Sequence, residues 1–145
     1  GNEFKINLPA YMSRAVNLNS AAILQWKSTV KDVYGFVIED NKEELKIAEM
    51  NFGSAKEFYE NFIADFLKGQ PKRKVGTPLF TEKDGISFVE ADVTYYDKDA
   101  KTDIYYLVGV VETKEAFYKV LSWCSAENKA KFKADFQKIV YSLKE

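Results

Sequence analysis

Histidine is missing from all 145 residues of the sequence. It is the side chain most often used for proton transfer near neutral pH, and it is the commonest metal ligand. Its absence excludes Ser-His and Cys-His nucleophile pairs, the zinc-binding HExxH helix and histidine-containing metal triads. Any chemistry would depend on carboxylates, lysines and tyrosines. We therefore predict that the chain is not an enzyme, and we assign it no catalytic residue.

Cysteine and arginine are also scarce. The single cysteine, Cys124, can form neither an internal disulfide nor a thiolate metal cluster, and we interpret it as a small buried hydrophobe. Arg14 and Arg73 are the only arginines, and 21 basic residues against 22 acidic ones give a net charge of −1. Nucleic-acid binders usually carry a basic surplus on one face. We therefore expect no nucleic-acid partner, and the scattered glycines and sparse ligands lead us to expect neither cofactor nor bound metal.

Long apolar runs are absent, since none approaches the roughly 18 residues that a membrane helix needs. The length corresponds to about one domain, which we assign to residues 1–145. The first residue is Gly1 rather than methionine, so we expect a processed or recombinant fragment of a longer precursor. This start is compatible with a signal-bearing precursor without showing one. Our prediction is an exported, periplasmic or envelope-associated protein after signal removal, with a cytoplasmic location as the alternative.

Two amphipathic helices are predicted. The first begins with a capping box at Ser54 and Glu57, and its apolar residues recur at three-and-four spacing until Gly69. The second begins after Ser125, which offers an N-cap, and carries an apolar stripe that ends at Leu143. A short helix is also predicted after Asp40. The long helices need a broad apolar surface to cover, and a sheet is the natural one.

Seven segments have the pattern of strands: 4–8, 21–29, 33–39, 75–80, 86–96, 104–112 and 116–124. The connectors in the second half are too short for parallel crossovers, so neighbouring strands should be antiparallel. Apolar residues on both faces of segment 104–112 indicate a central strand that is covered on both sides. We predict an α+β protein, a three-layer α/β/α sandwich around a central, mostly antiparallel sheet of about six or seven strands. Gly35 and Gly109 lie inside strands, which indicates bulges or a closely packed helix.

The order of these segments resembles the PsbP-like superfamily. The likeness rests on four segments: the opening strand Phe4–Pro9, the strand pair through Trp26 and Tyr34 to Glu39, the stretch Phe117–Ser122 that ends the meander, and the close of the terminal helix at Ile139–Leu143. The resemblance implies a single PsbP-like domain, and it implies a non-enzymatic partner of a larger assembly. We therefore expect a non-catalytic binding or assembly module of the bacterial cell envelope with a protein partner.

Tyrosines and aspartates gather around one predicted hairpin, where tyrosine offers contact area at little entropic cost. We predict a partner-binding patch with these members: Tyr95, Tyr96, Asp97, Asp99, Asp103 and Tyr105. Asp97, Asp99 and Asp103 could instead hold a cation, but they match a calcium loop poorly, and a solvated hairpin tip is the simpler interpretation. The residues leave this choice open.

Two further groups of charged residues suggest alternatives. Glu90 and Asp92 share one face of a strand, and in a pocket between the long helix and the sheet they could serve a small-ligand carrier or a weak hydrolase. An ion-paired polar face is the competing interpretation. The basic run Lys68, Lys72, Arg73 and Lys74 is interpreted as a solvated loop at a helix end, with a phosphate site as the alternative.

Overall fold

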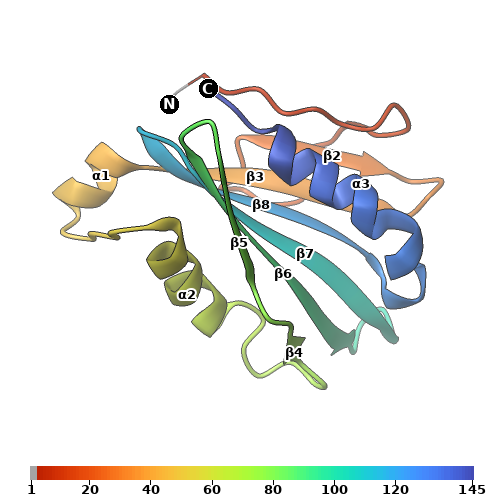
Figure 1. Cartoon of the computed structure of the whole chain (residues 1–145). Helices are drawn as coiled ribbons and strands as arrows, with labels where there is room; N and C mark the ends of the chain where they lie inside the picture. Colours follow the sequence, from red (N-terminus) through yellow and green to blue (C-terminus); the bar gives the residue numbers. More distant parts are fainter. Residues whose placement is uncertain (1–2) are drawn as a thin grey trace.

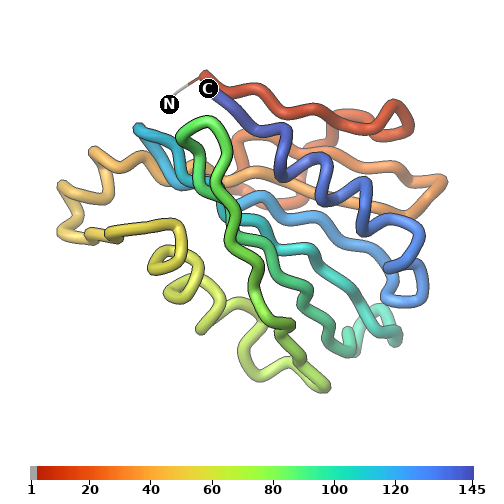
Figure 2. The backbone as a smooth tube through the Cα atoms, viewed as in Figure 1, coloured from red at the N-terminus to blue at the C-terminus, as the bar shows by residue number. Residues whose placement is uncertain are grey.

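The computed structural model describes residues 3–145, and it arranges the strands in one antiparallel sheet (Figures 1 and 2). The eight strands are β1 (Ser13–Arg14), β2 (Leu24–Ser28), β3 (Val33–Asn41), β4 (Lys74–Val75), β5 (Leu79–Lys83), β6 (Ile86–Asp97), β7 (Thr102–Glu112) and β8 (Ala116–Ser125). Their order is β1-β2-β3-β8-β7-β6-β4, and β5 also pairs with β6. Helices α1 (Lys42–Ile47), α2 (Ala55–Asp65) and α3 (Lys129–Ser142) and the 3-10 turn η1 (Ala126–Asn128) complete the described chain.

The long helices cover opposite faces of the sheet (Figure 1). Helix α2 packs Phe58 and Tyr59 against a core that includes Val93 and Val108. Helix α3 packs Phe136 and Ile139 against a second core. Because side chains alternate between the faces of a strand, each central strand supplies both cores. The predicted α+β fold with its mostly antiparallel sheet is confirmed. None of the helices in residues 3–145 is long and apolar enough to cross a membrane.

The N-terminal segment 4–8 corrects one sequence-based expectation, because it does not join the sheet as a strand. Its only ladder contact is an isolated bridge between Lys5 and Lys144, where each backbone N–H donates to the other residue's carbonyl. Phe4, Ile6 and Leu8 pack instead against the α3 core. The alternation of apolar residues therefore correctly indicates a half-buried extended segment. Its backbone, however, bonds to Lys144 near the C-terminus and not to a strand of the sheet.

The other differences concern where elements begin and end. The predicted strand 75–80 is divided into β4 and β5 by Gly76, Thr77 and Pro78, and both pieces pair with β6. Helix α2 ends at Asp65, before the predicted stop at Gly69, because Phe66 leaves helical geometry with ψ 119°. The hydroxyl of Ser54 accepts from the Glu57 N–H as predicted. Ser125 makes no side-chain cap and precedes η1.

Two glycines allow close packing on the α3 side of the sheet. A Cβ added to Gly35 would lie 2.2 Å from the indole Nε1 of Trp26, which is fully buried. A Cβ on Gly109 would lie 2.6 Å from Cγ2 of Val140 in α3. The predicted close approach of a helix is thus found at Gly109, whereas at Gly35 a neighbouring indole occupies the space.

Candidate functional site

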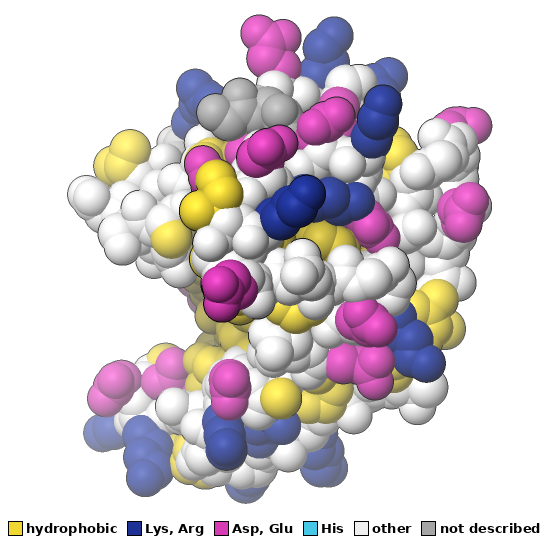
Figure 3. Space-filling view, turned by 90° about the vertical axis from the view of Figure 1, so that its left-hand side faces the viewer, with side chains coloured by type: hydrophobic (Ala, Val, Ile, Leu, Met, Phe, Trp, Pro, Cys, Tyr) yellow, Lys and Arg dark blue, Asp and Glu magenta, His cyan; other side chains and the backbone are white. Residues whose placement is uncertain are grey.

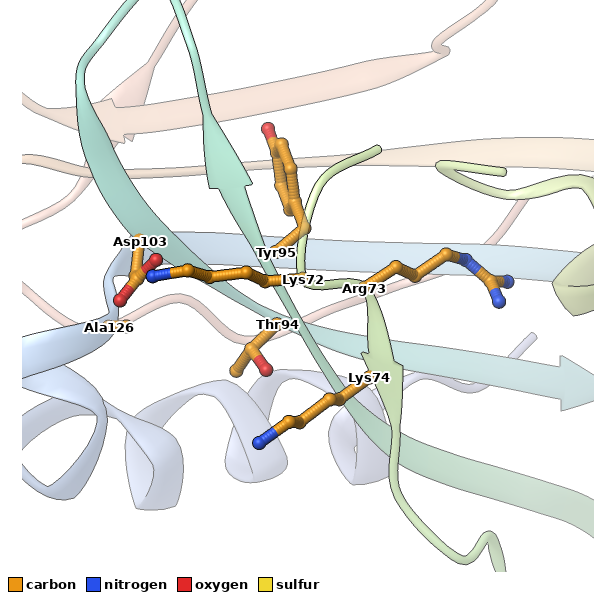
Figure 4. A pocket seen from close by; sticks show the side chains of 7 residues that line it. All are labelled: Lys72, Arg73, Lys74, Thr94, Tyr95, Asp103 and Ala126. Carbon is orange, nitrogen blue, oxygen red and sulfur yellow. The ribbon is translucent and has the colours of Figure 1, made fainter. Parts of the chain in front are cut away.

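An open cavity of about 530 Å³ lies at the end of the sheet where β6 passes into β7. It is lined by Lys72, Arg73, Lys74, Thr94, Tyr95, Asp103 and Ala126. These residues come from three distant parts of the chain: β4 with the loop before it, the β6–β7 hairpin and η1. Figure 4 shows the Lys72 and Lys74 amines and the Thr94 hydroxyl around this space. The volume is in the range typical of small-molecule sites.

Strand β4 fixes the position of the lysines. It pairs with β6 so that Lys74 lies directly opposite Thr94, and side chains opposite each other in a ladder share one face. The backbone N–H of Tyr96 donates to the carbonyl of Pro71 at 2.8 Å, which attaches the preceding loop to β6. Lys72 has φ +58°, a left-handed conformation that is uncommon for lysine. The pairing and the turn together direct both amines toward the cavity.

Arg73 has a structural role, although it stands between the two lysines. Its Nε donates to the carbonyl of Phe66 at 2.9 Å, and one terminal nitrogen donates to the carbonyl of Ile63. These carbonyls lie at the C-terminal end of α2, where backbone acceptors lack helical partners. Figure 4 shows the guanidinium directed away from the lysine amines. Arg73 therefore caps α2, and the lysines supply the positive charge of the cavity.

The predicted patch of tyrosines and aspartates is divided by the sheet. Tyr105 is fully buried on the α3 side and stacks on Phe136, so it offers no contact area to a partner. Tyr95 is 8% exposed and belongs to the opposite face, where it stacks with Tyr106. Tyr96 is half-buried, and the Lys72 amine lies over its ring, 5.5 Å from the ring centre. The expectation of one continuous patch is thus corrected, because successive residues of a strand point to opposite faces.

The aspartates of the patch lie at the tip of the β6–β7 hairpin. The Asp97 carboxylate accepts from the backbone N–H groups of Asp99 and Ala100, both at 2.9 Å, and from the Tyr95 hydroxyl. The hydrogen bond from Ala100 is the main reason why the pKa of Asp97 lies below its usual value. Asp99 and Asp103 are exposed. Within residues 3–145, no group of three or more acidic or cysteine side chains is placed to hold a metal ion.

Glu90 and Asp92 lie beneath α3, on the face opposite to α2. Glu90 is 5% exposed, and its carboxylate accepts from the Tyr141 hydroxyl at 2.8 Å and from the Gln137 amide. Asp92 accepts from the Tyr105 hydroxyl at 2.6 Å and from Lys133 at 2.7 Å. This placement corrects the expectation of carboxylates in a pocket beside the long helix that begins after Ser54. Instead, they form the polar part of the contact between the sheet and α3.

The ion pairs of Asp92 give the chain an expected sensitivity to acid. Burial raises the pKa of Asp92, but hydrogen bonds from Lys133 and Tyr105 outweigh burial, and the pKa lies below its usual value. A carboxylate with a lowered pKa contributes stability above its unfolded-state pKa, about 3.9, and this contribution is lost as pH falls through the folded-state pKa. We expect the unfolding free energy to decrease below about pH 4.

Urea denaturation followed by circular dichroism at pH 7 and pH 3 measures this decrease. Asp92→Asn should show a smaller difference between the two pH values than the parent chain, because the variant has no carboxylate to protonate at this position. Asp84→Asn, at the exposed turn between β5 and β6, is the matched control and should retain the parent difference. If Asp92→Asn lost as much unfolding free energy between pH 7 and pH 3 as the parent chain, Asp92 would not be a source of the acid sensitivity.

Cys124 is buried as predicted, at 1% exposure. Burial raises the pKa of its thiol to about 12. The thiolate, which is the nucleophilic form of cysteine, is therefore negligible near neutral pH.

No family model and no curated protein sequence matches the chain. Solved structures do match it. LpqN of Mycobacterium tuberculosis, described as involved in cell envelope biogenesis, has a TM-score of 0.66 and 9% identity, covering 97% of this chain and 81% of LpqN. Cyanobacterial PsbP from Synechocystis has a TM-score of 0.63 and 14% identity, covering 97% and 85%. The chain has a PsbP-like fold. PA94 of Pseudomonas aeruginosa, of unknown function, has a TM-score of 0.57 and 9% identity, covering 94% and 80%.

At these identities the PsbP-like likeness concerns the fold, and the site must be interpreted from its own residues. Two residues of the predicted patch, Tyr95 and Asp103, do line the cavity. The sequence pattern does not distinguish Thr94, and it indicates Lys74 only as part of the basic run. Thr94 and Lys74 are brought together by the short pairing of β4 with β6. This pairing could not be predicted, because a strand of two residues has no detectable periodicity.

Proposed function

We propose that the chain is a non-catalytic binding module of the bacterial cell envelope. The observation that carries this proposal is a contrast between reactive side chains that are already bonded or buried and a hairpin tip that is exposed. The carboxylates of Glu90 and Asp92 accept hydrogen bonds from α3 side chains, and Cys124 is buried with a raised pKa. The tip of the β6–β7 hairpin, in contrast, is exposed at the end of two strands of 12 and 11 residues.

The hairpin tip is a suitable contact surface for a protein partner. Lys98, Asp99, Lys101 and Asp103 are exposed there, while the hydrogen bonds to Asp97 hold the turn in one conformation. A surface that is ordered before binding loses less conformational entropy when a partner binds. The similarity of the fold to LpqN, which is described as involved in cell envelope biogenesis, supports an envelope setting.

Capture from a gently solubilised envelope of the source bacterium tests the proposal. We expect the full chain to retain one partner in constant stoichiometry, and Asp99→Lys to reduce its recovery at least ten-fold. The Asp99 side chain is a suitable target because only its backbone N–H takes part in the turn. The control is Glu115→Lys, an equal charge change at the exposed turn between β7 and β8.

Failure to recover any stoichiometric partner would overturn the proposed function. If Asp99→Lys recovered as much of the partner as the parent chain, the hairpin tip would not be the contact surface.

A further inference from the structure

Positive charge gathers around the cavity, although the whole chain has a net charge of −1. Lys74 is exposed, and within residues 3–145 its ammonium has neither a hydrogen-bond nor an ion-pair partner. Lys72 makes no ion pair in the same part of the chain, and its amine lies over the Tyr96 ring. Figure 3 shows Lys and Arg side chains gathered at the lower end of the molecule, the end where β4 lies in Figure 1.

Helix α3 adds two more lysines to the same face of β6. Lys133 lies 2.7 Å and Lys129 lies 3.3 Å from the same carboxylate oxygen of Asp92. Asp92 and Thr94 are two residues apart in β6 and therefore share a face. The Asp92 carboxylate thus pairs with two ammonium groups, Lys129 and Lys133, near Lys74. Asp103 is the only acidic residue that lines the described cavity. The local charge remains positive.

The chemistry of these groups favours phosphate over a metal ion or an apolar ligand. Lysine binds phosphate as a compact positive charge, and a threonine hydroxyl can donate a further hydrogen bond. A volume of about 530 Å³ exceeds what one phosphate ion fills, so the cavity has room for a substituent on the phosphate. Ala126 supplies carbon surface in the lining for that substituent.

We propose that this cavity binds a small phosphate monoester, with the phosphate between Lys72, Lys74 and Thr94. This site goes beyond the proposed function, because it requires no protein partner, although it shares Asp103 with the exposed hairpin tip. The basic run in the sequence thus contributes two of its four residues. Arg73 is engaged by α2, and Lys68 is exposed and does not line the cavity.

NMR titration of the purified full chain tests the site with phenyl phosphate, inorganic phosphate and phenol. Phenyl phosphate should shift the backbone amides of residues 72–74, 94, 103 and 126 in a saturable manner. Inorganic phosphate should bind the same residues at least three-fold more weakly, and phenol should not shift them at the same concentrations. Lys74→Gln should weaken phenyl phosphate binding at least ten-fold. Lys68→Gln, an equal change of charge in the same loop, should leave it within two-fold.

A vesicle experiment separates a free phosphate ester from a lipid headgroup. We expect the chain not to sediment with phosphatidylglycerol vesicles more than with phosphatidylcholine vesicles. Sedimentation with phosphatidylglycerol that Lys74→Gln abolishes would instead assign the cavity to a lipid headgroup, and would overturn the small-molecule proposal. Shifts spread over all exposed lysines, or equal binding by Lys74→Gln and the parent chain, would overturn the site itself. None of these outcomes depends on recovery of a protein partner.

Discussion

Gly35→Ala is expected to destabilise the chain by about 3 kcal/mol, at the upper end of the usual cost of overpacking a core. The new Cβ would lie 2.2 to 2.5 Å from three atoms of the Trp26 indole, closer than non-bonded atoms approach. Trp26 is fully buried and belongs to the α3 core, so the ring has little room to move. Urea denaturation followed by circular dichroism measures the loss.

A double-mutant cycle shows whether the indole causes this loss. Trp26→Phe removes part of the bicyclic ring, and we expect it to be destabilising alone and to reduce the further cost of Gly35→Ala by at least half. Additive effects of the two substitutions would indicate that the alanine acts through the backbone. A Gly35→Ala chain as stable as the parent would contradict the packing at this position.

Gly109→Ala is expected to cost about 2 kcal/mol, through displacement of α3 from the sheet. A Cβ at this position would lie 2.6 and 2.9 Å from the two Cγ atoms of Val140, and 3.2 Å from the Val120 carbonyl oxygen. Val140 is 1% exposed, so its side chain cannot turn into solvent. The measurement is again the unfolding free energy from urea denaturation.

Val140→Ala is the compensating substitution, because it removes both methyl groups that the new Cβ would meet. Alone it leaves a cavity and is expected to destabilise the chain, whereas Gly109→Ala/Val140→Ala should be more stable than the sum of the single effects predicts. The control pair is Gly109→Ala with Ile139→Val, which changes a neighbouring core residue. Equal coupling in both pairs would show that the effect is not specific to Val140.

Most of the fold could be predicted because its signals are local. The capping hydroxyl of Ser54 and the spacing of the apolar residues mark α2, and the short connectors imply antiparallel strands. The prediction of a strand at 4–8 is wrong because an apolar alternation shows that a segment is half-buried, without showing what pairs with its backbone. Its only bridge is to Lys144, at the other end of the sequence.

The candidate site was less predictable because it depends on contacts between distant segments. Tyr105 was expected at a surface, yet its ring is covered by Phe136, and its hydroxyl finds Asp92 across the strand pair. Glu90 was expected in a pocket, yet α3 brings Tyr141 and Gln137 over it. The sequence locates these residues on strands, but only the packing of the helix determines whether a polar side chain faces solvent or a partner.

The bridge between Lys5 and Lys144 places the two ends of the described chain side by side, close to Tyr118, which contacts both Phe4 and Glu145. Tyr118 pairs with Val111 near the end of β7, whereas Asp103 of the cavity lies at the beginning of the same strand. The first and last described residues therefore lie near one end of β7, and the cavity lies near the other. A surface linker attached through the C-terminal residue, Glu145, would be anchored at the end of the sheet away from the lysine-lined opening.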